Sequence, residues 1–512
     1  MLAQINSCGL LGIDGFPVRV EADVGSGLPA FNIVGLPDTA VREAKERVCT
    51  AVKNTGGIVP AKKIIINLAP ASQKKEGSHY DLAMATAILA ATEQIEIKNY
   101  ENMAFLGELS LDGTVQSVDG MLPMVISGYK AGIKIFFVPK ENADEAAVVT
   151  NAAIYPVEHL SEIIKHFRKE KPIERHTVNL NELINDNNAD LLDFAEVKGQ
   201  ENAKRALEIA AAGNHNVLMI GAPGTGKTML AQRISTILPD LTFEEALEVT
   251  KIHSIAGQLP KNVPLMTRRP FRHPHHTISA AALSGGGSNP KPGELSLAHN
   301  GVLFLDEFPE FQRNVLEVMR QPLEDGCVTI SRVNATLTYP CNLMLVASMN
   351  PCKCGYYGST KKACTCTPHQ LNQYRSKISG PLLDRIDIQV AVSEVEYNKL
   401  NSAQKAESSK VIKERVNRAR SVQLERYKNY GIYSNSQLTA GMLEEFCRLG
   451  KAESDVLKMA FDRLGLSARA YSRILKVART IADLEGENDI SAAHLAEATQ
   501  YRSLDRNYFE QL

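Results

Sequence analysis

The sequence predicts an α/β protein with a central parallel sheet, a mixed α+β region before it and a helical region after it. Between residues 191 and 395, short apolar runs alternate with helical patterns, which is typical of a parallel sheet. Residues 1–165 combine β-branched runs such as Ile64–Leu68 with a helical apolar stretch, His79–Thr92. Beyond residue 396 strand patterns are nearly absent, and the 512-residue length suits three domains.

Composition changes suggest the domain boundaries. Residues 166–190 are charged and rich in asparagine, which indicates a linker. The expected order is a front α+β domain 1–165, a linker 166–190, a central α/β domain 191–395 and a C-terminal helical lid 396–512. Within the lid, Gly465 and Gly486 are expected to end helices, and Ser491 is expected to begin one.

Composition also excludes several classes of protein. The chain has 57 basic and 58 acidic residues, so it is not a globally basic nucleic-acid binder. Apolar runs are too short for a membrane span. The N-terminus has no positively charged leader, so we expect no signal peptide. Nine cysteines are too few for a disulfide scaffold, but four lie within fifteen residues, which indicates a metal site in a reducing compartment. We therefore expect a cytoplasmic protein.

The strongest motif is GAPGTGKT, a complete G-x-x-x-x-G-K-[ST] phosphate-binding loop. It lies between an apolar strand, Val217–Ile220, and a helical stretch, Met229–Leu238. Backbone N–H groups of such a loop surround phosphate oxygens beside a helix N-terminus. Lys227 is expected to hold the β- and γ-phosphates, and Thr228 to bind Mg²⁺. The predicted nucleotide-binding residues are Gly221, Ala222, Pro223, Gly224, Thr225, Gly226, Lys227 and Thr228.

A second motif, GVLFLDE, follows about 75 residues later and reads as a buried strand that ends in two carboxylates. Asp306 is expected to join the Mg²⁺ shell, and Glu307 to polarise the attacking water as general base. Together the two motifs predict an ATPase that uses ATP and Mg²⁺.

Two further residues follow apolar segments in the same region. Asn350 comes after the predicted strand Leu343–Ala347, and its uncharged amide can orient the lytic water without competing for metal. Arg385 lies between apolar anchors in LLDRID and could reach the γ-phosphate of a neighbouring subunit. The alternative for Arg385 is a surface ion pair with Asp384 or Asp387.

The stretches GAPGTGKT, GVLFLDE, SMNPCKCG, SGPLLDRID and LSARAYSRILKVARTIADL together resemble the AAA+ ATPases related to the magnesium-chelatase I subunit. The front-domain stretches FNIVGLPD, INLAPA and ENMAFLGELSLDGTVQSVDGML extend this to the ComM subfamily, also called YifB, over residues 1 to about 505.

This resemblance implies a hexameric ring with nucleotide at the subunit interfaces. It would make Asn350 the sensor-1 residue, Arg385 a trans-acting finger and Arg469 the sensor-2 arginine, with Arg473 competing for that last role. It further implies a DNA helicase that promotes branch migration during natural transformation.

The front domain resembles the proteolytic domain of Lon, whose chemistry requires a serine nucleophile and a lysine base. In KEGSHYDLAMATAIL the nucleophile position is occupied by His79, and Ser78 lies one residue early. The parallel base region, 119–129, contains no lysine, although Ser78 with Lys130 is conceivable. We predict a proteolytically inactive domain for assembly or for binding partners such as recombination proteins.

Charge segregation bears on DNA binding. Residues 251–293 and 326–383 contain no Asp or Glu and are expected to form exposed loops or hairpins. Segments without carboxylates could follow a polyanionic backbone. The alternative is that acids are missing because a nucleotide or neighbouring subunit lies close by. The His-rich FRHPHHT segment has no obvious metal-ligand spacing. The candidate DNA contacts are Arg268, Arg269, Arg272 and Arg332, the last on a probable hairpin, Cys327–Tyr339.

Four cysteines form a C-x-C…C-x-C pair that can supply a tetrahedral Zn²⁺ site. They are Cys352, Cys354, Cys364 and Cys366. Redox chemistry or plain reduced thiols are the alternatives. Tyr356 and Tyr357 lie inside this finger and could stack on bases or simply pack.

These features predict an ATP-driven hexameric motor that acts on single-stranded, forked or junction DNA, most simply as a branch-migration helicase. Two rivals stay open: a chelatase-type motor that works with metal-insertion partners, and a nucleotide-gated scaffold for recombination proteins. An ATP-dependent protease is disfavoured by the missing Ser–Lys pair.

Overall fold

The computed structural model describes residues 1–180, 192–261, 263–287, 290–332, 335–359, 362–395, 406–464, 467–502 and 504. The chain divides into two compact units, and neither is a continuous stretch of sequence. Residues 246–267 and 331–338, which lie inside the predicted central domain, group with the front of the chain in the first unit. The predicted linker lies partly outside the described residues, from 181 to 190.

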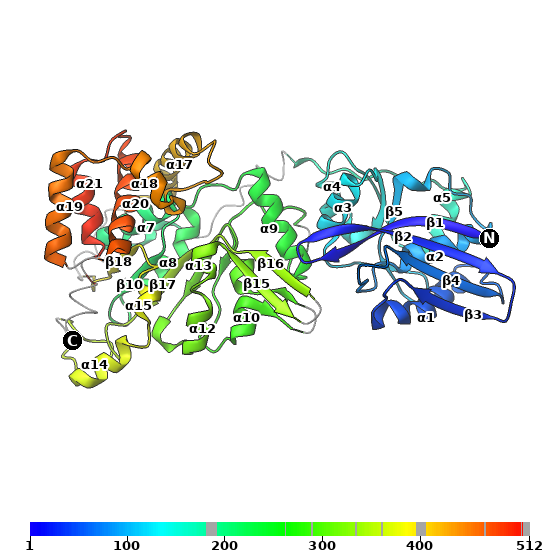
Figure 1. The fold of residues 1–512 in the computed structure, drawn as a ribbon, viewed down its shortest axis with the longest axis horizontal. Coiled ribbons are helices and arrows are strands. Elements are labelled where there is room, and N and C mark those ends of the chain that lie inside the picture. Colours follow the sequence, from blue (N-terminus) through cyan, green and yellow to red (C-terminus); the bar gives the residue numbers. More distant parts are fainter. Residues whose placement is uncertain are drawn as a thin grey trace. The chain divides into compact units, whose positions relative to one another are not determined.

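The first unit contains a seven-stranded mixed sheet in the order β3-β4-β2-β1-β5-β8-β9 (Figure 1). Its strands are β1 Leu2–Leu11, β2 Asp14–Gly25, β3 Ala30–Val34, β4 Lys63–Ala69, β5 Met103–Phe105, β8 Ile135–Pro139 and β9 Ala153–Val157, with a small pair β6 Glu108–Leu109 and β7 Val115–Gln116. Its helices include α1 Thr39–Asn54, α2 Asp81–Ala91, α3 Met121–Lys130, α4 Ala143–Ala147 and α5 Leu160–Phe167.

Helices cover both faces of this sheet. Neighbouring residues Phe136 and Phe137 of β8 belong to different hydrophobic cores, because successive side chains in a strand point to opposite faces. Helices α1 and α2 pack in the core that contains Phe137, and α3 and α4 pack in the other. The strand and the helix predicted at 64–68 and 79–92 are confirmed as β4 and α2.

The second unit contains a five-stranded parallel sheet in the order β11-β14-β17-β10-β18. These strands are β10 Val217–Ile220, β11 Phe271–Arg272, β14 Val302–Leu305, β17 Met344–Met349 and β18 Ile388–Ala391. Shorter pairs are β12 Gly285–Gly286 with β13 Lys291–Pro292, and the hairpin β15 Cys327–Arg332 with β16 Ala335–Pro340, of which residues 331–338 group with the first unit. The helices of the central region are α7 Glu201–Gly213, α8 Lys227–Arg233, α9 Phe243–Ile255, α10 Ala280–Ser284, α11 Glu294–Leu297, α12 Arg313–Val318, α13 Pro322–Asp325, α14 Pro368–Arg375 and α15 Gly380–Leu383; of these, α9 groups with the first unit from residue 246 onward.

The C-terminal region is helical, as predicted. Its helices are α17 Ser409–Arg426, α18 Ala440–Phe446, α19 Lys451–Leu464, α20 Ala468–Glu485 and α21 Ala492–Gln500. Gly486 ends α20 in a left-handed conformation with φ 77°, and Ser491 caps α21 through a capping box, which confirms both predicted positions. Gly465 lies outside the described residues.

The lid and the parallel sheet share one continuous hydrophobic core. Val217 and Val346 of the sheet belong to the same cluster as Val416 of α17 and Ile474 of α20. Within the second unit the lid is therefore built as part of the central domain and not as a separate globule. Among the described residues, no helix combines the length and apolar character needed to cross a membrane.

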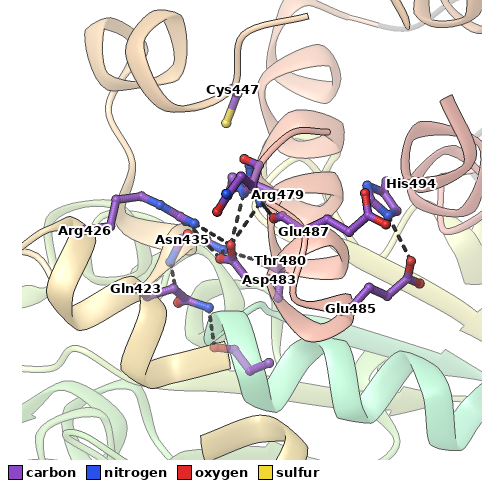
Figure 2. A network of polar contacts seen from close by, with 12 residues as sticks. Gln423, Arg426, Asn435, Cys447, Arg479, Thr480, Asp483, Glu485, Glu487 and His494 are labelled. Carbon is purple, nitrogen blue, oxygen red and sulfur yellow. Dashed lines mark hydrogen bonds and ion pairs between the residues drawn. The ribbon is translucent and has the colours of Figure 1, made fainter. Parts of the chain in front are cut away.

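A buried carboxylate, Asp483, organises the polar interior of the lid (Figure 2). Both terminal nitrogens of Arg426 donate to it at 2.6 and 3.0 Å, and Arg479 Nε donates at 3.1 Å. Asn435 Nδ2 adds a fourth bond of 2.8 Å. The Asp483 side chain is fully buried, so its charge is balanced by these cations rather than by water.

Candidate nucleotide site

The phosphate-binding loop joins the buried strand β10 to helix α8 in the second unit, as the motif predicts. Gly226 has φ 89°, a left-handed conformation that glycine adopts without steric cost, and α8 begins at the next residue, Lys227. Thr225 Oγ1 donates to Ala222 O at 2.9 Å and closes the loop on itself. The loop thus brings its backbone N–H groups to a helix N-terminus, where anions bind.

Three parallel strands deliver the remaining groups to the same edge of the sheet. Strand β17 pairs with both β10 and β14, so the residues after the carboxyl ends of these strands converge on the loop. Asp306 follows β14, and Asn350 follows β17. Lys227 Nζ donates to Asn350 Oδ1 at 3.2 Å, which places the lysine and the amide side by side.

Asp306 lies directly against the threonine of the loop. Thr228 Oγ1 donates to Asp306 Oδ2 at 2.8 Å, and Ser348 Oγ donates to Asp306 Oδ1. Hydroxyl and carboxylate oxygens are ligands that Mg²⁺ accepts, so this pair fits the metal that the motif implies. When bound, the metal would neutralise charge on the phosphates; Thr228 and Asp306 would hold it there, and Ser348 would orient the carboxylate.

The Lys227 side chain is hydrogen-bonded within the phosphate-binding loop. Its ammonium group donates to Gly221 O at 2.7 Å and to Ala222 O at 3.0 Å. Burial lowers the pKa of Lys227, while the charges of Asp306 and Glu307 oppose the shift. A triphosphate would supply the compensating negative charge for this desolvated cation.

Glu307 has an unusual backbone and a histidine neighbour. Its φ is 53°, a left-handed conformation that is rare for a residue other than glycine and that concentrates at functional sites. Its side chain is more than half exposed, and Glu307 Oε2 lies 3.4 Å from His276 Nδ1. Because Glu307 comes directly after Asp306, this backbone turn separates the two carboxylates. The Asp306 carboxylate contacts the threonine of the loop, and the Glu307 carboxylate is largely exposed.

A cavity of about 780 Å³ lies beside the phosphate loop. Its lining includes Pro223–Gly226 of the loop, Glu394 after β18, and three residues from the segment before α7, Glu196, Lys198 and Gln200. Tyr356 and Lys362 of the cysteine finger line it as well. The size is that of a small-ligand pocket, so a nucleoside attached to phosphates on the loop has room here.

Arg385 is engaged within its own chain. It donates to Pro381 O at 2.7 Å and forms an ion pair with Glu324, not with Asp384 or Asp387 as the alternative prediction has it. The Glu324 carboxylate is mostly exposed, whereas the Arg385 side chain is only 13% exposed. A role of Arg385 in trans therefore requires this ion pair to open.

The two sensor-2 candidates differ in their surroundings. Arg469 is 65% exposed and pairs with Asp384 at 3.3 Å. Arg473 binds the buried carboxylate of Asp387, which also lies 3.4 Å from His215 Nδ1. Burial alone would raise the pKa of Asp387, but Arg473 and His215 hold it well below its usual range. Arg473 is thus committed to structure, whereas Arg469 is available to a ligand.

The four cysteines come together as predicted. Cys352 Sγ lies 3.3 Å from Cys354 Sγ and 3.7 Å from Cys364 Sγ, and Cys354 and Cys364 are 3.5 Å apart. All four sulfur atoms, including that of Cys366, lie within 4.8 Å of one another. Thiolates around a tetrahedral Zn²⁺ at 2.3 Å would be about 3.8 Å apart, so the donor set fits this ion.

The predicted DNA contacts divide into two groups. Arg269 and Arg272 are engaged inside the protein, where they pair with Glu245 at 3.0 Å and with Glu294 at 2.6 Å. Glu245 and Glu294 lie just outside the acid-free block 251–293, so a count of charges within the block does not include these two partners. Neither arginine is free for a phosphate backbone. Arg268 is exposed, and the hairpin expected for Arg332 is present, although its side chain lies outside the described residues.

Part of the same block is structured in the first unit and not exposed as a loop. Helix α9 ends at Ile255 and packs there, where Gly120 N donates to Ser254 O at 3.2 Å and Ser254 Oγ donates to Glu145. Lys251, counted as a basic residue of the block, lies 3.9 Å from Asp14.

In the first unit, the described contacts do not pair a serine with a lysine at the position that parallels the Lon nucleophile. Ser78 Oγ donates to Glu108, a carboxylate, and not to Lys130. His79 is buried, and burial lowers its pKa to about 4. A serine that donates a hydrogen bond to a carboxylate, without a lysine base, does not reproduce the Ser–Lys chemistry.

Sequence reasoning missed two groups at the site. Ser348 lies in the stretch SMNPCKCG, for which the sequence predicts roles for Asn350 and the cysteines alone, yet Ser348 Oγ donates to Asp306 Oδ1. His276 belongs to the FRHPHHT segment, whose function was left open, and it reaches Glu307. A serine at the end of a strand, two residues before Asn350, is a usable signal; the approach of His276 to Glu307 depends on folding over 31 residues and has no such signal.

Comparison with known proteins agrees with this architecture. Family models described as magnesium chelatase subunit ChlI match residues 20–142 and 193–400, and one for the ChlI C-terminal region matches 406–502. The chain is 42% identical to competence protein ComM of Haemophilus influenzae over 99% of its own length and 98% of that protein. It is 43% identical to YifB of Salmonella typhimurium over the same shares. It is also 25% identical to the Lon protease of Brevibacillus choshinensis, over 31% of this chain and 22% of that protein.

Proposed function

Because the chain belongs to the ComM/YifB family of magnesium-chelatase-like AAA+ ATPases, we propose that it is a hexameric, ATP-driven DNA motor that promotes branch migration during natural transformation or recombination. The observation that supports a motor is the convergence of Lys227, Thr228, Asp306 and Asn350 at one sheet edge. The full-length similarity to a competence protein supports DNA as the substrate. Recombination proteins would bind the front domain, and the cytoplasm would keep the thiols reduced.

In this proposal each site residue has one task. Lys227 holds the β- and γ-phosphates, Thr228 and Asp306 hold Mg²⁺, and Glu307 accepts the proton of the attacking water. Asn350 orients that water. Arg469 senses the γ-phosphate in its own subunit.

Arg385 reaches the γ-phosphate of the neighbouring subunit, and Cys352, Cys354, Cys364 and Cys366 hold a structural Zn²⁺. A chelatase-type motor is the second candidate, because the matching family models carry that name.

DNA is expected to stimulate ATP hydrolysis, and added salt should remove the stimulation. Contacts to phosphates release counterions, so affinity falls steeply between 50 and 200 mM salt. The measurement is the ATPase rate with single-stranded, forked and four-way-junction DNA at both salt concentrations. Arg268→Ala should reduce the stimulation and leave the rate without DNA unchanged. A rate that no DNA alters at either salt would favour the chelatase or scaffold function.

Replacing Arg385 by alanine is expected to lower turnover by a factor of about 10³ or more while ATP still binds, because the finger acts on the neighbouring site. Mixing Arg385→Ala with Glu307→Gln subunits should restore part of the activity. In mixed rings, an intact Glu307 receives an intact finger from its neighbour. The checks are the ATPase rate over a range of mixing ratios and the size of the assembly. Mixed assemblies that form but stay inactive would exclude a finger acting in trans.

A further inference from the structure

The cysteine finger, described here by residues 351–359 and 362–367, contacts the nucleotide pocket at three points. Gly355 packs on the phosphate loop: a Cβ at this position would lie 2.7 Å from two ring carbons of Pro223. Ser359 Oγ donates to Glu394 Oε1 at 3.1 Å, and Glu394 lines the pocket. Tyr356 and Lys362 line the pocket themselves. The finger is therefore a wall of this pocket.

The aromatic part of this wall has the chemistry of a base-binding surface. Lys362 Nζ lies over the Tyr356 ring, 4.5 Å from its centroid, so a cation and a π face meet at the pocket. The phosphate loop, Pro223–Gly226, lines the same pocket. A nucleotide with its phosphates on the loop would extend its base toward this wall, and base–aromatic stacking is sequence-tolerant and substantial.

The neighbouring tyrosine faces different partners. Tyr357 is 42% exposed and lies under Arg375, whose guanidinium carbon is 4.9 Å from the ring centroid. Tyr357 is not among the residues that line the pocket. Tyr356 therefore lines the pocket and the adjacent Tyr357 does not, so Tyr357 provides a matched control for substitutions of Tyr356.

The position of the wall depends on the sulfur cluster. Cys354 immediately precedes Gly355 and Tyr356, and the N–H of Tyr357 donates to Cys352 Sγ at 3.3 Å. Cys364 lies two residues after Lys362. A metal ion bound by the four thiolates would fix both ends of the wall, because metal binding organises the segments that supply its ligands.

We propose that the cysteine finger holds the base of the bound nucleotide through Tyr356, so that metal occupancy of the cysteine cluster sets the affinity for ATP. This rests on the ATPase and zinc assignments above and goes beyond both. The zinc site then does more than stabilise the local fold, because its occupancy regulates nucleotide binding.

The first test uses the full-length chain with Tyr356→Ala. Loss of the stacking ring should weaken binding of a fluorescent ATP analogue about tenfold. Inorganic tripolyphosphate, which has no base, should show the same inhibition constant against that analogue in both proteins. Tyr356→Phe should restore binding, and Tyr357→Ala should leave it unchanged. Equal ATP affinity in Tyr356→Ala and wild type would overturn the proposal, whereas failure of ATP and tripolyphosphate alike to bind wild type would overturn the ATP site itself.

The second test removes the metal with a chelator that spares Mg²⁺. Zinc content is measured by atomic emission, and retention of the fold by circular dichroism. Metal-free protein should bind the ATP analogue several-fold more weakly, and added Zn²⁺ should restore the affinity. A zinc-loaded and a metal-free protein with the same affinity would contradict the coupling. Absence of zinc from the purified protein, with no uptake on addition, would instead contradict the zinc site.

Discussion

Glu307→Gln is expected to leave ATP binding near the wild-type level and to reduce turnover by a factor of about 10²–10⁴, the contribution of a positioned general base. The isosteric amide keeps the size of the side chain but cannot accept a proton. Asp306, Thr228 and Lys227, which contact one another or the loop, are untouched by the change. The measurements are the turnover number and the affinity for a fluorescent ATP analogue.

Glu310→Gln is the matched control for this variant. Glu310 lies three residues further on, is 43% exposed and pairs with Lys377 at 3.0 Å. Its loss should leave turnover unchanged, because surface ion pairs contribute little. Turnover of Glu307→Gln within a factor of two of wild type would remove Glu307 from the mechanism and direct attention to His276, its neighbour.

Asp483→Asn is expected to destabilise the second unit by about 3–5 kcal/mol, the typical effect of removing one partner of a buried ion pair. The amide has the shape of the carboxylate but no charge. Arg426 and Arg479 would then be buried without their counter-ion (Figure 2). Because the chain has no tryptophan, unfolding in urea is best followed by circular dichroism.

Glu485→Gln provides the comparison on the same helix. Glu485 is 47% exposed and pairs with His494 at 3.0 Å and Arg205 at 3.3 Å. Its replacement should change stability by no more than about 1 kcal/mol. Equal stability losses for Glu485→Gln and Asp483→Asn would show that the ion pairs of Asp483 with the two arginines contribute no more to stability than exposed ion pairs do.

The local parts of the site could be predicted because each depends on a short stretch of sequence. The apolar run 217–220 has the same bounds as β10, and the loop after it has the conformation that its glycines permit. The four cysteines meet because each C-x-C pair places two thiols together before tertiary folding matters. The helical C-terminal region follows from apolar periodicity and from its stop and start residues.

The rest depends on contacts that no window of sequence contains. Arg272 was expected to face DNA, but its partner, Glu294, is 22 residues away and outside the block in which acids were counted. Tyr356 was expected to stack on DNA or to pack, and the pocket it lines is made by three other segments. Residues 246–267 group with the first unit, whereas domain boundaries predicted from sequence assume that each domain is one continuous segment.

The shared core of sheet and lid has a consequence for how such proteins can be recombined. Residues 193–400 and 406–502 match separate family models, as if they were independent modules. Yet Val217, Val346, Val416 and Ile474 lie in one apolar cluster. A chimera that joined this sheet to the lid of a distant relative would mismatch complementary surfaces across that cluster, and interiors pack too densely to absorb such a mismatch. Sheet and lid should therefore be inherited, exchanged and engineered as one piece.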